Sequence, residues 1–231
     1  MEPIADNIWL AEGPIVSFYG FPYPTRMVVV RLPDGTLWVW SPVALTPALR
    51  EAVSALGTPA HLVSPNAIHH LFLSEWKDAW PDAKLWGPQT TIRKRSDLSF
   101  EPPLEETPPP AWGGVLALAW FRGSPFLDEL FFVHLPSKTA ILADASENFS
   151  EAFLSAHWSG WKHRLARVWG IVEGKGYAPL EWRLSFFRRE AARGAVRTLI
   201  ALEPERVIMA HGQWQRSGGR AYLERCFAWL L

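Results

Sequence analysis

The sequence has a single cysteine, Cys226, among its 231 residues. One thiol excludes an internal disulfide and a thiolate metal cluster, and it is typical of a reducing compartment. No run approaches the 18 apolar residues of a membrane-spanning helix, and the first residues have neither the basic nor the apolar segment of a signal peptide. We therefore expect a soluble, cytoplasmic protein.

The chain also has no excess of charge, because 23 Lys and Arg residues balance 23 Asp and Glu residues. A polyanion-binding role has no global charge to support it, so we expect no nucleic-acid partner. A small-molecule substrate or ligand is the expected partner, and the sequence does not give the oligomeric state. Fourteen tryptophans, most of them at periodic apolar positions, predict core packing or pocket walls.

Apolar periodicity and turn residues predict a mixed α/β order of elements. The strongest local signal is a β-hairpin over 27–40 with an Asp34-Gly35 turn. The other predicted strands cover 7–10, 60–64, 83–86, 115–121, 130–135, 138–144 and 206–210, and the predicted helices cover 46–56, 153–172, 182–202 and 221–231. Residues 91–110 are polar and rich in proline, which predicts an irregular surface connection.

Two adjacent histidines follow the strand predicted at 60–64. Asn66 is a good N-cap, so His69 and His70 are expected in the first turn of a helix that ends before Pro81. Neighbouring helical side chains point about 100° apart, so both can bind one metal only at a junction between loop and helix. The alternative is that one histidine is solvated and the other packs.

Other candidate residues lie at strand ends. Asp144 ends an apolar strand, where a carboxylate can bind a metal or orient a base, although a turn or N-cap role is an equal alternative. His211 follows the strand at 206–210. Glu129 could supply a further ligand or base, but a surface role is favoured, and His134 alternates with apolar residues as a hydrogen-bonded core histidine does.

Two basic segments have alternative roles. Arg93-Lys94-Arg95 could bind an anionic group, although such a run more often forms a solvated face. The predicted helix at 153–172 is basic and rich in tryptophan, so it could lie on a membrane or line a pocket. A helix that faces the core is favoured, and a membrane partner is not expected.

The order of these elements resembles the metallo-β-lactamase superfamily over nearly the whole chain. Within it, the chain looks most like an uncharacterised branch, a domain of unknown function, with Ser41-Pro42 after the hairpin and a Pro-Asn-x-x-His-His segment at 65–70. The resemblance implies a single domain over 1–231 with an αββα sandwich, in which helices flank two mixed β-sheets.

The metal motif of the superfamily, His-x-His-x-Asp-His, is degenerate in this chain. It falls on 65–70, where Pro65 and Ala67 replace the first two histidines, His69 replaces the aspartate and only His70 is identical. The histidine of the next metal loop is missing near Gly123-Ser124.

Two later positions of the superfamily motif are kept. Asp144 matches the aspartate at a strand end, and His211-Gly212 matches the final Gly-His-Gly element, with Ala210 in place of its first glycine. The resemblance therefore implies at most one metal, held by His70, Asp144, His211 and also His69, with Asp144 and His70 as the catalytic candidates.

Three imidazoles and one carboxylate suit zinc, and also iron(II) or manganese. Four protein ligands on zinc would make a structural site, whereas three would leave a position for a reactive water. The sequence thus supports a metal-dependent hydrolase with an unidentified substrate. The alternative is a metal-free descendant of the fold that binds a small molecule or a protein.

Overall fold

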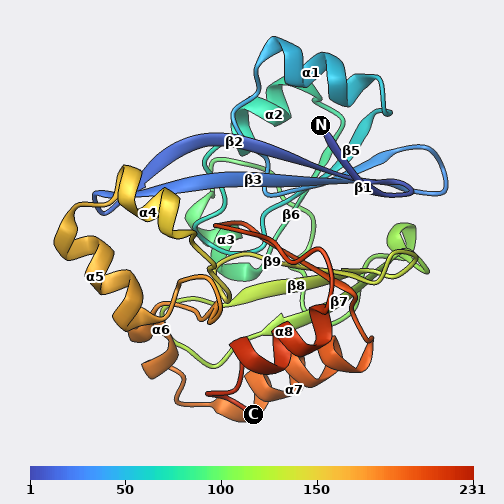
Figure 1. Ribbon diagram of the computed structural model, residues 1–231. Coiled ribbons are helices and arrows are strands. Elements are labelled where there is room, and N and C mark those ends of the chain that lie inside the picture. Colours follow the sequence, from blue (N-terminus) through green and yellow to red (C-terminus); the bar gives the residue numbers. More distant parts are fainter.

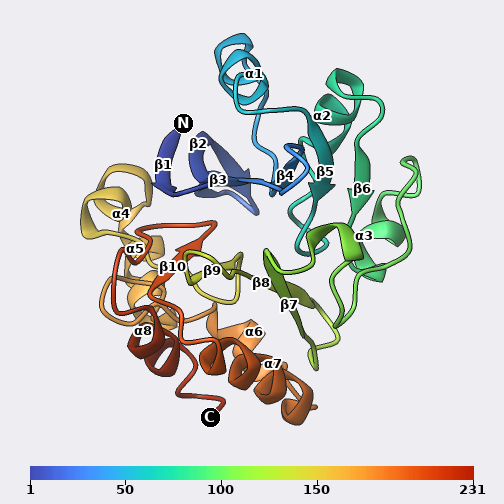
Figure 2. The same ribbon diagram turned by 90° about the vertical axis from the view of Figure 1, so that its right-hand side faces the viewer.

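The computed structural model describes residues 1–231, which form two facing β-sheets between layers of helices (Figure 1). Strands follow the order β1-β2-β3-β4-β5-β6 in one sheet and β10-β9-β8-β7 in the other. In Figure 2, α1 and α2 lie outside the first sheet, and α7 and α8 cover the second. The predicted αββα sandwich of two mixed sheets is confirmed.

The first sheet contains the predicted hairpin. Its strands are β1 (Glu2–Ala5), β2 (Ile8–Phe18), β3 (Phe21–Arg31), β4 (Leu37–Trp40), β5 (Pro59–Val63) and β6 (Lys84–Trp86). β1 to β4 are antiparallel, and β5 and β6 run parallel to β4. In the turn between β3 and β4, the carboxylate of Asp34 accepts hydrogen bonds from the backbone N–H and hydroxyl of Thr36, and Gly35 has a φ of 84°. The Asp-Gly turn therefore forms as its sequence requires.

The second sheet is built from β7 (Leu116–Phe121), β8 (Glu129–His134), β9 (Thr139–Leu142) and β10 (Arg206–Met209). β7, β8 and β9 are antiparallel neighbours, and β10 runs parallel to β9. Every residue of β8 and β9 is buried. Burial on both faces explains why these strands are nearly continuous apolar runs.

Apolar side chains fill the space between the sheets and beneath the helices. Trp38, Trp112 and Phe132 are fully buried between the two sheets, in edge-to-face contact with one another. Trp76 of α2 packs on the outer face of the first sheet, and Phe131 packs beneath α7 and α8 on the outer face of the second sheet. Each such side chain contributes roughly 1.5–3 kcal/mol on burial. Seven of the fourteen tryptophans are buried, and Trp169 and Trp182 line a pocket, so the predicted roles in the core and in pocket walls both occur, whereas Trp161 is exposed.

The helices near the first sheet differ in part from expectation. α1 (Pro47–Ser54) begins after Thr46, whose hydroxyl accepts from the backbone N–H of Leu49, as predicted. α2 (Leu73–Ala79) begins later than predicted, and α3 (Gln89–Lys94) forms where an irregular connection was expected. A short 3-10 helix, η1 (Pro110–Trp112), precedes β7.

Both long helices predicted in the second half are broken. The segment predicted at 153–172 forms α4 (Glu151–His157) and α5 (Gly160–Trp169), because Trp158 turns inward and its indole N–H donates to the carbonyl of Pro22. The segment predicted at 182–202 forms α6 (Leu180–Leu184) and α7 (Arg189–Ala201). The hydroxyl of Ser185 bonds the Trp182 carbonyl and lies 2.6 Å from that of Ser124 at this second break.

The closing helix, α8 (Gly219–Cys226), begins and ends earlier than the predicted 221–231. It packs on the outer face of the second sheet together with α7. None of the helices combines the length and apolar character needed to cross a bilayer.

Candidate metal site

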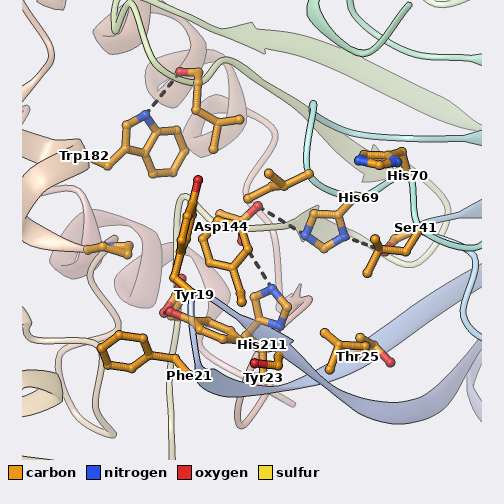
Figure 3. Close-up of a pocket in the computed structure, with 18 of the residues that line it drawn as sticks. Tyr19, Phe21, Tyr23, Thr25, Ser41, His69, His70, Asp144, Trp182 and His211 are labelled. Atoms are coloured by element: carbon orange, nitrogen blue, oxygen red, sulfur yellow. Dashed lines mark hydrogen bonds and ion pairs between the residues drawn. The ribbon is translucent and has the colours of Figure 1, made fainter. Parts of the chain in front are cut away.

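Three predicted site residues meet at one edge of the sandwich, because three strands end there. His69 lies in the turns after β5, Asp144 follows β9 and His211 follows β10. One ligand atom from each lies within 4.8 Å of the other two. Figure 3 shows the three side chains pointing toward one another.

Asp144 lies between the two imidazoles. Its Oδ2 is 3.2 Å from His69 Nε2, and its Oδ1 is 3.2 Å from His211 Nε2. All three side chains are at most 9% exposed. Burial raises the pKa of Asp144, but His69 and His211 lower it more, so the net pKa lies below its ordinary value. The carboxylate is therefore ionised at neutral pH.

Asn66 explains why His69 points into the site. The Oδ1 atom of Asn66 accepts from the backbone N–H groups of Ile68 and His69, and its Nδ2 donates to Asp144 Oδ2 at 2.6 Å. The hydroxyl of Ser64 bonds the carbonyls of Asn66 and His69. These bonds hold residues 66–72 in turns, so the regular helix starts only at Leu73. Asn66 thus caps this segment as predicted, but both histidines precede the helix.

Each histidine is fixed by a partner on its other nitrogen. His69 Nδ1 lies 2.7 Å from the hydroxyl of Ser41, and His211 Nδ1 lies 2.7 Å from the carbonyl oxygen of Pro24. Because a carbonyl only accepts, His211 carries a proton on Nδ1. If its ring is neutral, the lone pair of Nε2 faces the Asp144 carboxylate. Two such acceptors attract each other only through a cation between them, either a proton or a metal.

The residues fit a metal ion. Ligands about 2.0–2.1 Å from a tetrahedral zinc lie roughly 3.3 Å apart, close to the two separations of 3.2 Å. Imidazole and carboxylate suit zinc, iron(II) or manganese, and each ligand here has a hydrogen-bond partner that orients it. Three protein ligands leave a further coordination position free.

His70, the fourth predicted ligand, is not part of this group. Its side chain lies on the far side of His69 from Asp144 (Figure 3), and its Nδ1 is buried without a hydrogen-bond partner. Burial lowers the pKa of His70, and the charges of Lys94 and Arg95 lower it further. Adjacent side chains diverge in these turns, so only one of the two histidines reaches the aspartate. The catalytic role of His70 stays a prediction.

The surface role favoured for Glu129 is wrong, because its side chain is completely buried. Its carboxylate accepts from the backbone N–H groups of Ala143, Asp144 and Ala145 at 2.7, 2.8 and 3.0 Å. Burial and the Asp144 charge raise the pKa of Glu129 to about 8. Glu129 therefore fixes the loop that presents Asp144. No local sequence pattern predicts this role, because the backbone groups that Glu129 binds lie 14 to 16 residues away.

His134 is buried, and its Nδ1 lies 2.7 Å from the hydroxyl of Ser137, which confirms the predicted hydrogen-bonded core histidine.

Tyr23 and Glu147 lie near the metal group, although the sequence did not single them out. The Tyr23 hydroxyl donates to Glu147 Oε2 at 3.4 Å, and the Tyr23 ring packs edge-on against His211. Burial raises the pKa of both groups, with a smaller contribution from neighbouring carboxylates. Burial therefore disfavours the ionised form of Glu147.

The three residues lie in a pocket of about 780 Å³. Its walls come from the β2–β3 hairpin, the turns before α2, the loop before β8, and α6, and the large side chains among them are mainly aromatic and aliphatic. Phe21 and Trp182 lie on one side of the metal group in Figure 3, and His70 and Ser41 on the other. This volume suits a ligand of drug-like size.

Comparisons with solved structures match the whole sandwich. A metallo-β-lactamase from Erythrobacter litoralis with β-mercaptoethanol in its active site has a TM-score of 0.65 at 14% identity, over 99% of this chain and 94% of that one. One from Pontibacter korlensis has a TM-score of 0.63 at 12% identity, over 99% and 96%. FIM-1 from Pseudomonas aeruginosa, in its mono-zinc form, has a TM-score of 0.62 at 11% identity, over 99% and 93%.

The chain has the metallo-β-lactamase fold. Residues 5–92 also match the family described as Domain of unknown function (DUF4336), which agrees with the uncharacterised branch expected from the sequence. Comparison with curated protein sequences gives no match. Within this metallo-β-lactamase fold, the residues that remain for a metal are His69, Asp144 and His211.

Proposed function

We propose that this protein is a hydrolase that depends on one metal ion, held by His69, Asp144 and His211. The observation that carries the proposal is the pair of 3.2 Å separations from Asp144 to the two imidazoles, each of them oriented by its own hydrogen-bond partner. Zinc is the expected ion, and iron(II) or manganese fits the same ligands. The mono-zinc form of FIM-1 supports the use of this fold with a single metal.

A bound metal would supply a water whose pKa is lowered to about 7, able to attack an ester, amide or phosphoester. The chain's own residues bind and orient the substrate around it. His70 lines the pocket as a neutral imidazole, so it can exchange a proton with a bound molecule and remains the second catalytic candidate beside Asp144. Tyr23 packs its ring edge-on against His211 and donates its hydroxyl hydrogen bond to Glu147, which supports the position of that imidazole.

The competing function is a binding module without a metal. Pro65 and Ala67 stand where the superfamily has ligands, and the pocket is apolar enough to bind a small molecule unaided. Metal content distinguishes the two functions, because the hydrolase requires a bound metal ion and the binding module does not.

Elemental analysis of protein purified without chelator tests the proposal. We expect about one equivalent of metal in the wild type and in His70→Ala, and a loss of metal in His69→Ala and Asp144→Asn. His70→Ala is the matched control, since it removes an adjacent imidazole from outside the group. If the wild-type protein contained no metal even after reconstitution, the hydrolase proposal would be wrong and a metal-free binding module would be the remaining function.

Aryl and alkyl esters are the first substrates to screen. Activity should disappear on chelation and return with the metal that the analysis identifies. We further propose a cytoplasmic location, supported by the single, buried cysteine and tested by cell fractionation.

A further inference from the structure

The pocket has one cationic side chain, Lys94, and a wall of aromatic side chains, and its carboxylates are those of Asp144, Glu147 and Glu181. Lys94, at the end of α3, and His70 line it on one side. Tyr19, Phe21 and Trp182 line it from the hairpin tip and α6. In Figure 3, His70 lies on one side of His69 and Asp144, and Phe21 and Trp182 lie on the other.

Lys94 is a free cation in this arrangement. Its neighbour Arg95 pairs with Asp97 at 2.7 Å and also bonds the His70 carbonyl, whereas Lys94 has no acidic partner. An unpaired ammonium group on a pocket wall favours an anionic group of the ligand.

The aromatic side is open to large apolar groups. Tyr19 and Phe126 are 88% and 79% exposed although both line the pocket, and Phe18 and Leu71 are also exposed there. Soluble proteins seldom gather large exposed apolar side chains around a cavity unless these contact a ligand or a partner. A long apolar group that enters past Tyr19 and Phe126 would cover them.

We propose that the pocket binds a single-chain amphiphile, with its anionic group at Lys94 and its apolar chain along Tyr19, Phe21 and Trp182. This proposal deepens the proposed function and rests on it for one point. The bond that joins the apolar chain to the anionic part of the ligand is taken to lie at the metal group. The hydrolysed substrate would then be an acyl compound with a carboxylate on its other part. Water adds to the acyl carbon, the ester or amide bond breaks, and a fatty acid and a small anionic alcohol or amine leave.

Calorimetric titration of metal-free protein tests the binding, so a failure of hydrolysis cannot be mistaken for a failure of recognition. The probe is N-lauroylglycine below its micelle-forming concentration. Two comparisons accompany it: N-lauroylglycinamide, which lacks the negative charge, and N-hexanoylglycine, which has a shorter chain. Lys94→Ala is the test variant, and Arg93→Ala is the matched control because Arg93 is exposed on the same helix and does not line the pocket.

We expect N-lauroylglycine to bind about three- to tenfold more tightly than its amide, and Lys94→Ala to remove that preference while Arg93→Ala keeps it. Affinity should rise about two- to fourfold for each methylene group that enters the pocket. Tyr19→Ser should weaken the lauroyl compound more than the hexanoyl compound. Equal binding of acid and amide, or an affinity that does not change with chain length, would overturn the proposal even if the metal site is active.

Discussion

Asn66 donates a hydrogen bond to Asp144 across the two sheets, with 2.6 Å between Nδ2 and Oδ2. The same side chain accepts from the backbone N–H groups of Ile68 and His69. One buried amide therefore positions two of the three residues of the metal group, one on each side of the sandwich.

Asn66→Ala should weaken metal binding about 10- to 100-fold, as the loss of a residue that orients metal ligands usually does. It should also destabilise the protein by about 1–3 kcal/mol, since buried hydrogen-bonding groups lose their partner. His61→Ala is the control, because His61 is buried in a hydrogen bond with Trp86 away from the site. We expect the control to lose stability and keep its metal affinity, as measured by competition with a chromogenic chelator. Equal metal affinities in the two variants would show that Asn66 does not position the ligands.

Gly212→Ala should disrupt the site through the backbone. Gly212 has a φ of 84°, and a Cβ atom there would clash with the carbonyl oxygen of Asn148. We expect a loss of about 2 kcal/mol or more, together with weaker metal binding because His211 must move. Denaturant unfolding measures the first effect and metal titration the second.

Gly194→Ala should stabilise the protein, in contrast to Gly212→Ala. Gly194 lies in α7, and a Cβ atom there would contact nothing within 4 Å. This variant should gain roughly 0.5–1 kcal/mol and leave the metal affinity unchanged. A destabilised Gly194→Ala would contradict the helix described here.

We expect the buried side chain of His134 to make the stability of the protein fall at acidic pH, independently of the metal. Burial lowers the pKa of His134 to about 4 in the folded state, against 6.5 for the ordinary side chain. Between these values the unfolded chain binds a proton that the folded protein does not, so stability falls as the pH drops from about 6.5 toward 4. The stability of His134→Gln should fall less steeply over this window, as measured by urea unfolding at a series of pH values. Parallel curves would exclude His134 as a source of the sensitivity.

The sequence predicts the strand ends better than the side chains that meet there. The Asp34-Gly35 hairpin, the apolar strands and the residues Asp144 and His211 follow from local pattern and the resemblance, and the structure brings both site residues to one edge. The choice between His69 and His70 does not follow, because the bonds of Asn66 to the backbone delay the helix to Leu73.

Contacts between distant segments account for the remaining differences. Glu129 is buried because backbone groups after β9 bind its carboxylate, and Trp158 breaks a helix because its indole bonds Pro22 on the hairpin. The Ser159-Gly160 pair marks this break in the sequence, although apolar residues keep helical spacing on both sides of it. Sequence patterns record which face of an element is apolar, but not which distant backbone group will accept or donate a hydrogen bond.

Metal binding should raise the thermal stability of the protein, because the three ligands come together only in the folded chain. At a free metal concentration about 100 times the dissociation constant, the gain is about 2.7 kcal/mol. Differential scanning calorimetry of chelator-treated protein with added zinc, iron(II) or manganese would rank the three ions by the rise in Tm. Asp144→Asn keeps the size of the side chain and removes the charge between the imidazoles, so its Tm should rise far less with the same ion. A wild type whose Tm does not respond to any of the three ions would oppose a resident metal, while binding of the amphiphile to metal-free protein would still be open to direct measurement.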